Sequence, residues 1–476
     1  MAKSQIKLHY KNVMADVIGD EHGITTAQFD ALAEHTLPLI AQINNERTAG
    51  KTPYRDLPYK TETAENVREL VAEIKEGCEV FVVLGIGGSA LGNIALQTAL
   101  NPSMYNLDGT QRRGPRLFVF DNVDPAQFAS FLDWVEDKLD NTMFNVISKS
   151  GRTAETASQF MIVRQLLMDR LGPEGLRDHV VATTDADKGT LRTIAMDANL
   201  RCLEVPDGVG GRFSVLSAVG LLSAAMCGID IDGLLAGARD MDARVSRESF
   251  RENPAALNAA IHYHFYTHGK RNSVIMPYSC ALKDMADWYR QLWAESLGKR
   301  FDLKGSEVCV GPTPIKALGA TDQHSQVQLY REGPNDKLFT FLQVDHHGQQ
   351  LKIGPAPDCA AELGYLAGKD LGSLLNNEKR GTEYALLRDK RPCLTVLFDR
   401  VSAHTVGQFI YFFEVTTSLA GALFGINPYD QPAVELGKEA TFALMGKEGN
   451  YKDDYTYAQF ANDIRAETNV DENFLV

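Results

Sequence analysis

From residue 80 onward, short apolar runs alternate with helical stretches, and this alternation restricts the possible folds more than any other feature. Each run is followed by a polar or glycine-containing turn and then by a stretch with helical apolar spacing. Strand, turn and helix repeated in this order predict an α/β protein built on a parallel sheet with helices on both faces. The predicted strands of this first series are Val80–Leu84, Arg116–Phe120, Met143–Ser148, His179–Thr183 and Arg201–Val205.

A second and weaker series of the same kind begins after about residue 245. Its predicted strands are Ser273–Pro277, Gln326–Arg331, Leu338–Val344 and Thr395–Phe398. Its predicted helices are Pro254–His268, Ala281–Leu297 and Val406–Phe424. The sequence therefore predicts a second α/β unit with a parallel sheet sandwiched by helices.

The two series suggest a division of the chain into four parts. Residues 1–50 form an N-terminal segment with two predicted helices, Thr26–Glu34 and Leu37–Arg47. The first, larger α/β domain is predicted over residues 51–240, and the second over residues 241–430. Residues 431–476 are predicted to form a polar, helical C-terminal arm. The longest apolar run, Val215–Ile229, is 15 residues long. It is too short to span a membrane, so we predict a buried helix there.

Charge and cysteine content narrow the possible partners and compartment. The chain has 48 Lys and Arg against 62 Asp and Glu, a net charge of −14, which argues against nucleic acid or an anionic membrane surface as partner. An anionic small molecule remains possible if a pocket is locally basic. Seven scattered cysteines without a CxxC pair favour a reducing compartment, and the N-terminus lacks the apolar stretch of a signal peptide. We therefore predict a cytoplasmic protein.

The first chemical motif is the glycine-rich segment Gly85–Gly92, directly after the first predicted strand. Glycines there let the backbone approach a ligand, and the following helix offers N–H groups and a positive dipole end. The segment also reads as GxGxxA, close to a dinucleotide-binding fingerprint, but the nearest acidic candidate, Asp121, lies too far along the chain. Dinucleotide binding, binding of another phosphate and a structural tight turn all remain open for this motif alone.

The second motif, Ser148–Thr156, follows the strand Met143–Ser148 and enters a helix. Four hydroxyls and Lys149 crowd into nine residues, together with Arg152. Plain helix capping by Ser150 or Thr153 accounts for one or two of these groups, but not for all of them. The segment is not a Walker A loop, and we interpret it as a phosphate cradle at the carboxyl edge of the sheet.

Two further segments contain candidate charged groups. In Asp207–Ser214, paired glycines present Arg212 at the start of an apolar helix, where it is better aimed at an anion than at the helix itself. Glu295 lies in the last turn of Ala281–Leu297, a poor position for an acid relative to the helix dipole. An exposed Arg and a solvated Glu are the simpler alternatives.

His324 lies in the polar turn Gly319–Gln326, where a structural histidine is the simpler interpretation. Near the C-terminus, Gln431 and Lys438 are seven residues apart, which predicts that they lie near one helix face. A capped surface helix is the alternative for that segment.

The histidine-rich segments do not form a metal-binding pattern. His262, His264 and His268 lack an HExxH pattern, and Asp345-His346-His347 has no second cluster to complete a site, so we predict no metal site.

Taken together, these segments resemble the glucose-6-phosphate isomerase family, in the compact form typical of its bacterial members. Asp207–Ser214 is similar to one family signature, and Gly421–Lys438 is similar to the other. Gly85–Gly92, Ser148–Thr156, Glu295–Lys299 and Gly319–Gln326 fall in the expected order around them. One departure is Pro432-Ala433, where many members have an aromatic residue and Gly, and residues 1–50 carry no motif that matches.

The resemblance implies two sugar-isomerase (SIS) subdomains and a homodimer whose active site lies at the subunit interface. It also implies an aldose–ketose isomerase of glycolysis and gluconeogenesis that interconverts D-glucose 6-phosphate and D-fructose 6-phosphate through a cis-enediolate. Hydrogen moves as a proton in such a reaction, so neither a cofactor nor a metal is expected.

The resemblance also implies a role for each candidate residue. Glu295 is the base that carries the proton between C2 and C1. His324 handles proton transfer at the ring oxygen, with Lys438 in the same region, and Arg212 stabilises the enediolate. The residues implied in substrate binding are Gly88, Ser89, Ser148, Lys149, Ser150, Thr153, Gly211 and Gln431.

Three other interpretations remain to be separated from this one. A non-catalytic SIS-type sugar-phosphate sensor would keep the phosphate loops without needing Glu295, His324 and Lys438 together. A NAD-dependent dehydrogenase built on Gly85–Gly92 would bind nicotinamide. An isomerase of another hexose phosphate, such as mannose 6-phosphate, differs only in its substrate profile.

Overall fold

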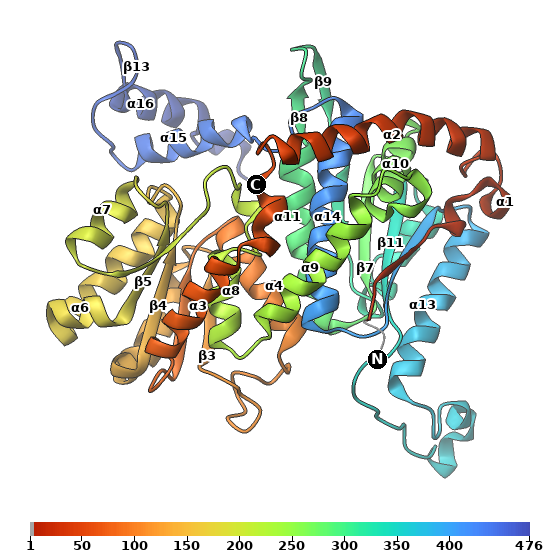
Figure 1. Ribbon diagram of the computed structural model, residues 1–476, viewed down its shortest axis with the longest axis horizontal. Helices are drawn as coiled ribbons and strands as arrows, with labels where there is room; N and C mark the ends of the chain where they lie inside the picture. The colour runs from red at the N-terminus through yellow and green to blue at the C-terminus, as the bar shows by residue number, and fades with distance from the viewer. Residues whose placement is uncertain (1–3) are drawn as a thin grey trace. The chain divides into compact units, whose positions relative to one another are not determined.

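Two five-stranded sheets form the centre of the larger part of the chain (Figure 1). The computed structural model describes residues 4–476. The chain divides into a large unit that ends at Pro428 and a small unit, Tyr429–Val476. Both sheets belong to the large unit, and its further division near residue 240 stays a prediction.

The first sheet is wholly parallel, with strand order β3-β2-β4-β5-β6. Every residue of β2 and β4 is buried, as expected for central strands covered on both faces. All five strands were predicted to within two residues, and the expected α/β fold is confirmed. The strands are β2 (Val80–Leu84), β3 (Arg116–Phe120), β4 (Thr142–Ile147), β5 (Val180–Thr184) and β6 (Arg201–Glu204).

Helices cover both faces of this sheet. Phe128, Phe160 and Leu191 come from three helices and share one apolar cluster with Val82 of β2. The helices of that face are α5 (Pro125–Val135), α6 (Ala154–His179) and α7 (Thr190–Asp197). The remaining helices, α3 (Thr61–Ile74), α4 (Leu91–Leu100) and α8 (Ala218–Met226), pack on one another, and α8 also contacts β2.

The second sheet has strand order β1-β12-β11-β7-β10. Its four larger strands are parallel, and the short strand β1 (Lys7–His9) pairs antiparallel with β12 at one edge. The parallel strands are β7 (Asn272–Pro277), β10 (Thr313–Lys316), β11 (Lys337–Val344) and β12 (Cys393–Phe398). The helices α12 (Val327–Glu332) and α13 (Leu371–Arg388) pack on one face through the cluster around Phe339 and Leu386.

One predicted strand of this sheet is wrong. Gln326–Arg331 falls in helix α12, and the edge position of the sheet is taken by β10. Alternating polar and apolar residues suggested a strand, in which Val327 and Leu329 would share a face. Instead Val327 and Tyr330, three residues apart, pack on the core while Leu329 is exposed, so the helical period prevails.

A layer of long helices lies between the sheets in Figure 1. Helix α14 (Ala403–Phe424) packs along α9 (Ile231–Val245) and α10 (Pro254–Thr267). Helix α11 (Lys283–Leu297) packs against α4 of the first half and against β7, β10 and α14 of the second. Side chains on α11 therefore lie where the two halves of the large unit meet.

At the N-terminus, the two predicted helices form one helix, α2 (Thr26–Thr48), which follows the short α1 (Ala15–Ile18). The helix continues through Pro38 because Phe29, Ile40 and other side chains of one face are buried along its length. Packing thus outweighs the backbone hydrogen bond that the proline removes. The predicted buried helix within Val215–Ile229 is present as α8.

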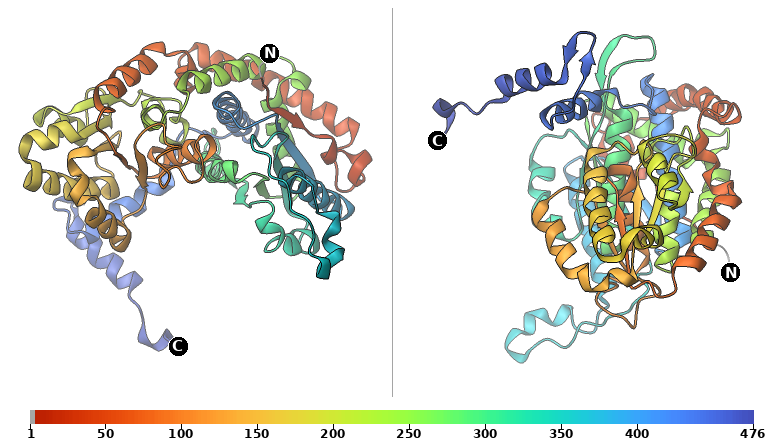
Figure 2. Two further views of the ribbon diagram at one scale, coloured as in Figure 1. Left: turned by 90° about the horizontal axis from the view of Figure 1, so that it is seen from below. Right: turned by 90° about the vertical axis from the view of Figure 1, so that its left-hand side faces the viewer.

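Two shorter segments complete the large unit. Strands β8 (Lys299–Phe301) and β9 (Glu307–Val310) form an antiparallel hairpin directly after α11. Between β11 and α13, a loop with a 3-10 helix, Asp358–Tyr365, projects from the body in Figures 1 and 2. None of the helices in residues 4–476 is long and apolar enough to cross a membrane.

The small unit consists of two helices and a hairpin. Helices α15 (Glu435–Leu444) and α16 (Tyr457–Thr468) flank the strands β13 (Asn450–Lys452) and β14 (Tyr455–Thr456). Ala443, Tyr457 and Ala461 form its buried core, with Phe442 and Phe460 packed against them. This core is small, so the unit has little apolar area of its own to stabilise it.

Helix α14 also carries a buried acid. Glu414 is fully buried, and neither of its carboxylate oxygens has a hydrogen-bond partner within residues 4–476. Burial away from any compensating charge raises the pKa of Glu414 well above its usual value of 4.5. The fold therefore favours the neutral form of this side chain, and ionising it there costs about 1.4 kcal/mol per unit of pKa elevation.

We predict that Glu414→Gln stabilises the protein at high pH but not at low pH. Because the pKa is raised on folding, the favourable contribution is fully present below about 4.5 and is lost as the pH rises through the folded-state value. The difference in thermal midpoint between variant and parent should grow from pH 5 to pH 8. Glu65→Gln, the same change at an exposed position of α3, controls for the loss of one charge. An equal difference at both pH values would contradict the prediction.

Candidate functional site

The glycine-rich loop after β2 passes unusually close to a second backbone segment. Residues Gly87–Ser89 form a short 3-10 turn between β2 and α4, and Gly87 has a φ of +57°. A Cβ atom on Gly88 would lie 2.1 Å from the carbonyl carbon of Gly211 and 2.7 Å from the backbone nitrogen of Arg212. Only glycine permits this approach. The contact joins the loop after the first strand to the segment that carries Arg212.

The second predicted loop closes on itself after β4. The Ser148 hydroxyl accepts a hydrogen bond from the backbone N–H of Gly151 at 3.0 Å, and the Ser150 hydroxyl accepts one from the N–H of Arg152 at 3.2 Å. Thr153 is the N-cap residue of α6, yet its side chain makes no capping bond to the helix. The Thr153 hydroxyl lies 3.4 Å from that of Ser148 instead. Capping therefore does not explain this group of hydroxyls, and an anion at the start of α6 would meet both N–H and O–H donors.

Lys149 makes contacts that the sequence did not suggest. Its ammonium group donates to the carbonyl oxygen of Pro206 and to the Asp207 carboxylate, both at 3.4 Å. Hydrogen bonding from the Gly208 backbone and from Lys149 lowers the pKa of Asp207. Lys149 thus ties the loop after β4 to the start of the segment after β6. The phosphate role expected for its side chain stays a prediction.

Arg212 is the most buried charged group of the site. Its side chain is 2% exposed, and its Nε donates to the Ser296 hydroxyl at 2.7 Å. One Nη donates to the carbonyl oxygen of Pro428 at 2.8 Å, and the other lies 3.4 Å from Oε1 of Glu295. The structure therefore brings together two of the predicted site residues, Arg212 and Glu295, although they are 83 positions apart in the chain.

Glu295 lies on the last turn of α11 and is 26% exposed, so one side of its carboxylate faces an opening. Lys299 donates to the backbone carbonyls of Glu295 and Ser296 at 2.9 and 2.8 Å, which holds this turn in place. A partly open carboxylate next to a buried guanidinium can accept a proton while the guanidinium faces negative charge.

Gln291 belongs to this group, although it was not among the expected site residues. Its side-chain nitrogen donates to Oε2 of Glu295 at 3.1 Å. The same nitrogen would be 3.0 Å from a Cβ atom on Gly87, so it also lies against the glycine loop. The signal that could have found it is its position one helical turn before Glu295 on α11.

His324 is positioned away from these contacts. It is exposed at the end of a 3-10 turn, and its ring forms no hydrogen bond or ion pair with any residue of the described chain 4–476. The turn itself is held firmly. The Tyr278 hydroxyl donates to Gln323 at 2.6 Å, and Asp322 accepts from the backbone N–H of Leu318 at 2.6 Å. The structure thus fixes the backbone of His324 but does not join its side chain to Glu295.

Gln431 and Lys438 lie in the small unit. Lys438 is exposed on α15 and pairs with Glu435 at 2.7 Å. The expectation that Gln431 and Lys438 lie near one helix face is wrong. Gln431 has a φ of −153° and precedes a 3-10 turn, Pro432–Val434, so α15 begins only at Glu435. Pro432 starts this tighter turn, and helical register with Gln431 is lost.

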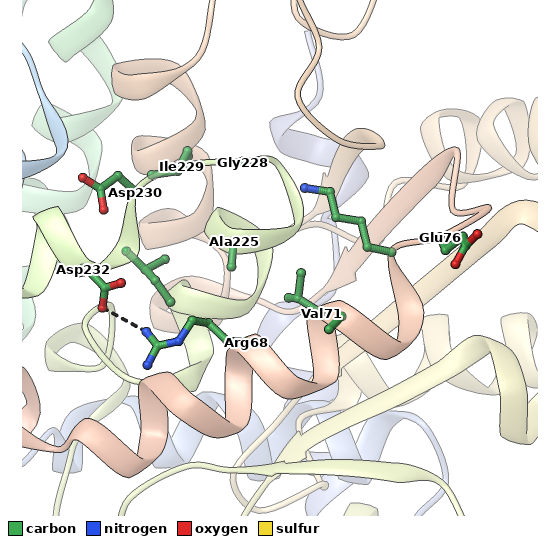
Figure 3. A pocket seen from close by; sticks show the side chains of 11 residues that line it. Arg68, Val71, Glu76, Ala225, Gly228, Ile229, Asp230 and Asp232 are labelled. Carbon is green, nitrogen blue, oxygen red and sulfur yellow. Dashed lines mark hydrogen bonds and ion pairs between the residues drawn. The ribbon is translucent and has the colours of Figure 1, made fainter.

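A separate surface depression of about 670 Å³ lies between α3, the end of α8 and the start of α9 (Figure 3). Its Arg68 and Asp232 form an ion pair at 2.9 Å, and Asp230 caps α9 through the N–H of Gly233. It lies at the opposite end of α8 from Arg212. Arg68 and Asp232 thus already neutralise each other there, whereas the carboxylate of Glu295 is partly exposed beside a buried guanidinium.

Comparison with known proteins agrees with this arrangement of loops and charges. The family model described as phosphoglucose isomerase matches residues 61–454. The chain belongs to the phosphoglucose isomerase family. The matched range contains the glycine loop, the hydroxyl loop, Arg212, Glu295, His324 and Lys438, whereas the N-terminal helices lie before it.

Curated relatives cover nearly the whole chain. A glucose-6-phosphate isomerase from Carboxydothermus hydrogenoformans is 46% identical over 93% of this chain and 95% of its own length. One from Rubrobacter xylanophilus is 41% identical over 92% and 99%. Both relatives therefore align with more than nine-tenths of this chain.

Solved structures support the fold. A hypothetical protein from Thermus thermophilus aligns with a TM-score of 0.81 and 33% identity, over 93% of this chain and all of its own. A glucose-6-phosphate isomerase from Chlamydia trachomatis aligns with a TM-score of 0.70 and 24% identity, over 81% and 73%. At that identity the second likeness shows the fold alone.

We predict that Gly88→Ala lowers the isomerase activity of this family member by about 100-fold or more. The added methyl group would overlap backbone atoms of Gly211 and Arg212, which cannot move aside as a side chain can. Displacing catalytic groups by about 1 Å is enough for a loss of this size. Steady-state kinetics and the thermal midpoint should be measured together. Gly381→Ala in α13, where an added Cβ meets nothing within 4 Å, is the matched control and should keep both values.

Proposed function

We propose that this chain interconverts D-glucose 6-phosphate and D-fructose 6-phosphate through ring opening and proton transfer in a cis-enediolate intermediate. Its family and the names of its curated relatives support an isomerase rather than a sensor or a dehydrogenase. The observation that carries the proposal is the approach of buried Arg212 to within 3.4 Å of the open carboxylate of Glu295, beside the glycine loop. A panel of hexose phosphates, including mannose 6-phosphate, tests the substrate.

The phosphate of the substrate binds at the start of α6. Ser148, Ser150 and Thr153 supply hydroxyls there, and Ser89 adds another from the neighbouring loop, since β2 and β4 are adjacent strands of one sheet. Lys149 contributes positive charge while it holds the loop to Asp207. The phosphate is remote from the reacting carbons, so its binding energy orients C1 and C2 toward Glu295.

Isomerisation begins once the ring is open. Glu295 removes the proton from C2, the electron pair forms a double bond between C1 and C2, and the carbonyl oxygen at C1 becomes negatively charged. Arg212 stabilises that charge. The hydroxyl proton at C2 passes to the negatively charged oxygen at C1, Glu295 returns its own proton to carbon C1, and the oxygen at C2 becomes the carbonyl of the ketose. A proton is transferred and no electrons are lost to an acceptor, so the reaction needs no redox cofactor.

Ring opening requires its own proton transfer. His324 donates a proton to the ring oxygen, the hydroxyl at C1 releases its own proton to solvent, and the bond between C1 and the ring oxygen breaks to give the open-chain aldehyde. Lys438 contacts the same region, and Gln431 with Gly88 and Gly211 seats the sugar. These roles follow the family motifs on which the residues lie.

We predict that Glu295→Gln abolishes isomerisation while the sugar phosphate still binds. Glutamine keeps the size of the side chain and its contact with Gln291, but it cannot accept a proton from carbon. Turnover should fall by about 10⁴-fold or more, whereas binding of fructose 6-phosphate, measured by calorimetry, should change by less than about tenfold. A coupled assay in the glucose 6-phosphate direction measures turnover. Near-normal turnover would remove Glu295 from the role of base.

We further propose a homodimer in which His324 serves the site of the other subunit. Three facts support it: His324 is exposed, its ring forms no hydrogen bond or ion pair with the described chain, and its turn is rigid. The hairpin β8–β9 also exposes Phe301 and Leu303, whose side chains are 50% and 68% accessible. Apolar groups of this kind are favourable at an interface between copies.

Complementation between inactive variants tests this arrangement. In a dimer with one Glu295→Gln chain and one His324→Ala chain, one of the two sites would combine an intact Glu295 with an intact His324. Coexpression at equal levels should restore about a quarter of the parental activity, because half of the dimers are mixed. Coexpression of Glu295→Gln with Arg212→Ala should restore none, since those residues come from one chain. Absence of rescue in the first pair would contradict a shared site.

We also propose that the protein works in the cytoplasm, in glycolysis and gluconeogenesis. All seven cysteines are free, although three of them are exposed, which suits a reducing compartment. The net charge of −14 makes nucleic acid and anionic membranes unfavourable partners.

A further inference from the structure

The guanidinium of Arg212 is held more closely by two neutral oxygen atoms than by the carboxylate of Glu295. Its Nε donates to the Ser296 hydroxyl at 2.7 Å and an Nη donates to the Pro428 carbonyl at 2.8 Å. The distance from the other Nη to Glu295 is 3.4 Å. An unconstrained hydrogen bond between an arginine and a carboxylate is usually about 2.7–2.9 Å long and is often bidentate. The Arg212–Glu295 pair is therefore held apart by the groups that bind the rest of the guanidinium.

Ser296 is suited to set this separation because it follows Glu295 directly on α11. Its side chain is fully buried, so its hydroxyl has one stable position. Lys299 holds the backbone carbonyls of both residues, which fixes the carboxylate and the hydroxyl relative to each other. The Arg212 guanidinium, which is bound to the Ser296 hydroxyl, is therefore positioned relative to the Glu295 carboxylate by the last turn of α11.

We propose that Ser296 is a positioning residue for the isomerisation, which rests on the function proposed above. By holding Nε of Arg212, it keeps the guanidinium from closing on Glu295. The carboxylate then stays available to take the proton from carbon, and the guanidinium stays beside it, where negative charge develops on the enediolate. Ser296 acts through Arg212 and does not itself touch the substrate.

Ser296→Ala tests the proposal. Without the hydroxyl, Arg212 moves onto Glu295 and forms a closed pair. We expect kcat to fall by about 10- to 100-fold, while KM changes less than about threefold because the phosphate cradle lies on other loops. The acidic limb of the pH profile of kcat/KM should move to lower pH, since a closed cation neighbour favours the ionised carboxylate. Ser296→Thr, which retains a hydroxyl, should recover part of kcat.

Ser223→Ala is the matched control, because Ser223 is likewise a buried helical serine whose hydroxyl bonds to a side chain, that of Asn93. It should lower the thermal midpoint without moving the pH profile. A Ser296→Ala variant with unchanged kcat, or with a loss of stability but an unshifted profile, would overturn the positioning role. If the parent protein had no isomerase activity, or if the Glu295→Gln variant were active, the proposed function itself would be wrong. The failure of the positioning role and the failure of the proposed function are therefore distinguishable.

Discussion

The contact of Gly88 with the backbone of Gly211 and Arg212 is the constraint on which the site depends. It brings the loop after the first strand against the segment after the last strand of the same sheet, closer than any side chain would allow. Arg212 then enters the space beside α11, where Ser296 and Glu295 meet it. The position of the Arg212 guanidinium therefore depends on the absence of a side chain at Gly88, which lets the two backbone segments meet.

The site lies where the two α/β halves meet, and that location explains its mixture of rigid and open groups. The two loops proposed to bind phosphate follow strands of the first sheet, whereas α11 packs on both β7 of the second sheet and α4, which lies beside the first. A helix held from both sides can carry a base with little freedom, as its last turn shows. Binding energy at the phosphate can then be transmitted to the reacting carbons without rearrangement of the base.

Much of the fold could be predicted because parallel strands that are buried on both faces read as short apolar runs. Val80–Leu84 shows this pattern without interruption. The errors arose where a short segment fits two periods: Gln326–Arg331 alternates like a strand, yet Tyr330 is buried as part of a helix. For the site, the sequence motifs identified Arg212 and Glu295 as candidates. They did not predict the contact of Gln291 with Glu295 and the glycine loop, or the ion pair between Lys149 and Asp207. Contacts between the loops and α11, or between the loops after β4 and β6, join segments far apart in the sequence, so no local pattern predicts them.

His324 is a predicted site residue whose side chain the described residues do not join to Glu295. His324 has a rigid turn but no hydrogen-bond or ion-pair partner for its ring within residues 4–476, while Gln431 and Lys438 follow Pro428, at the end of the large unit. Arg212 binds the carbonyl of Pro428, and the ring of Pro428 leaves no room for a Cβ on Gly421. The same guanidinium that faces Glu295 therefore also holds the C-terminal end of the large unit in place.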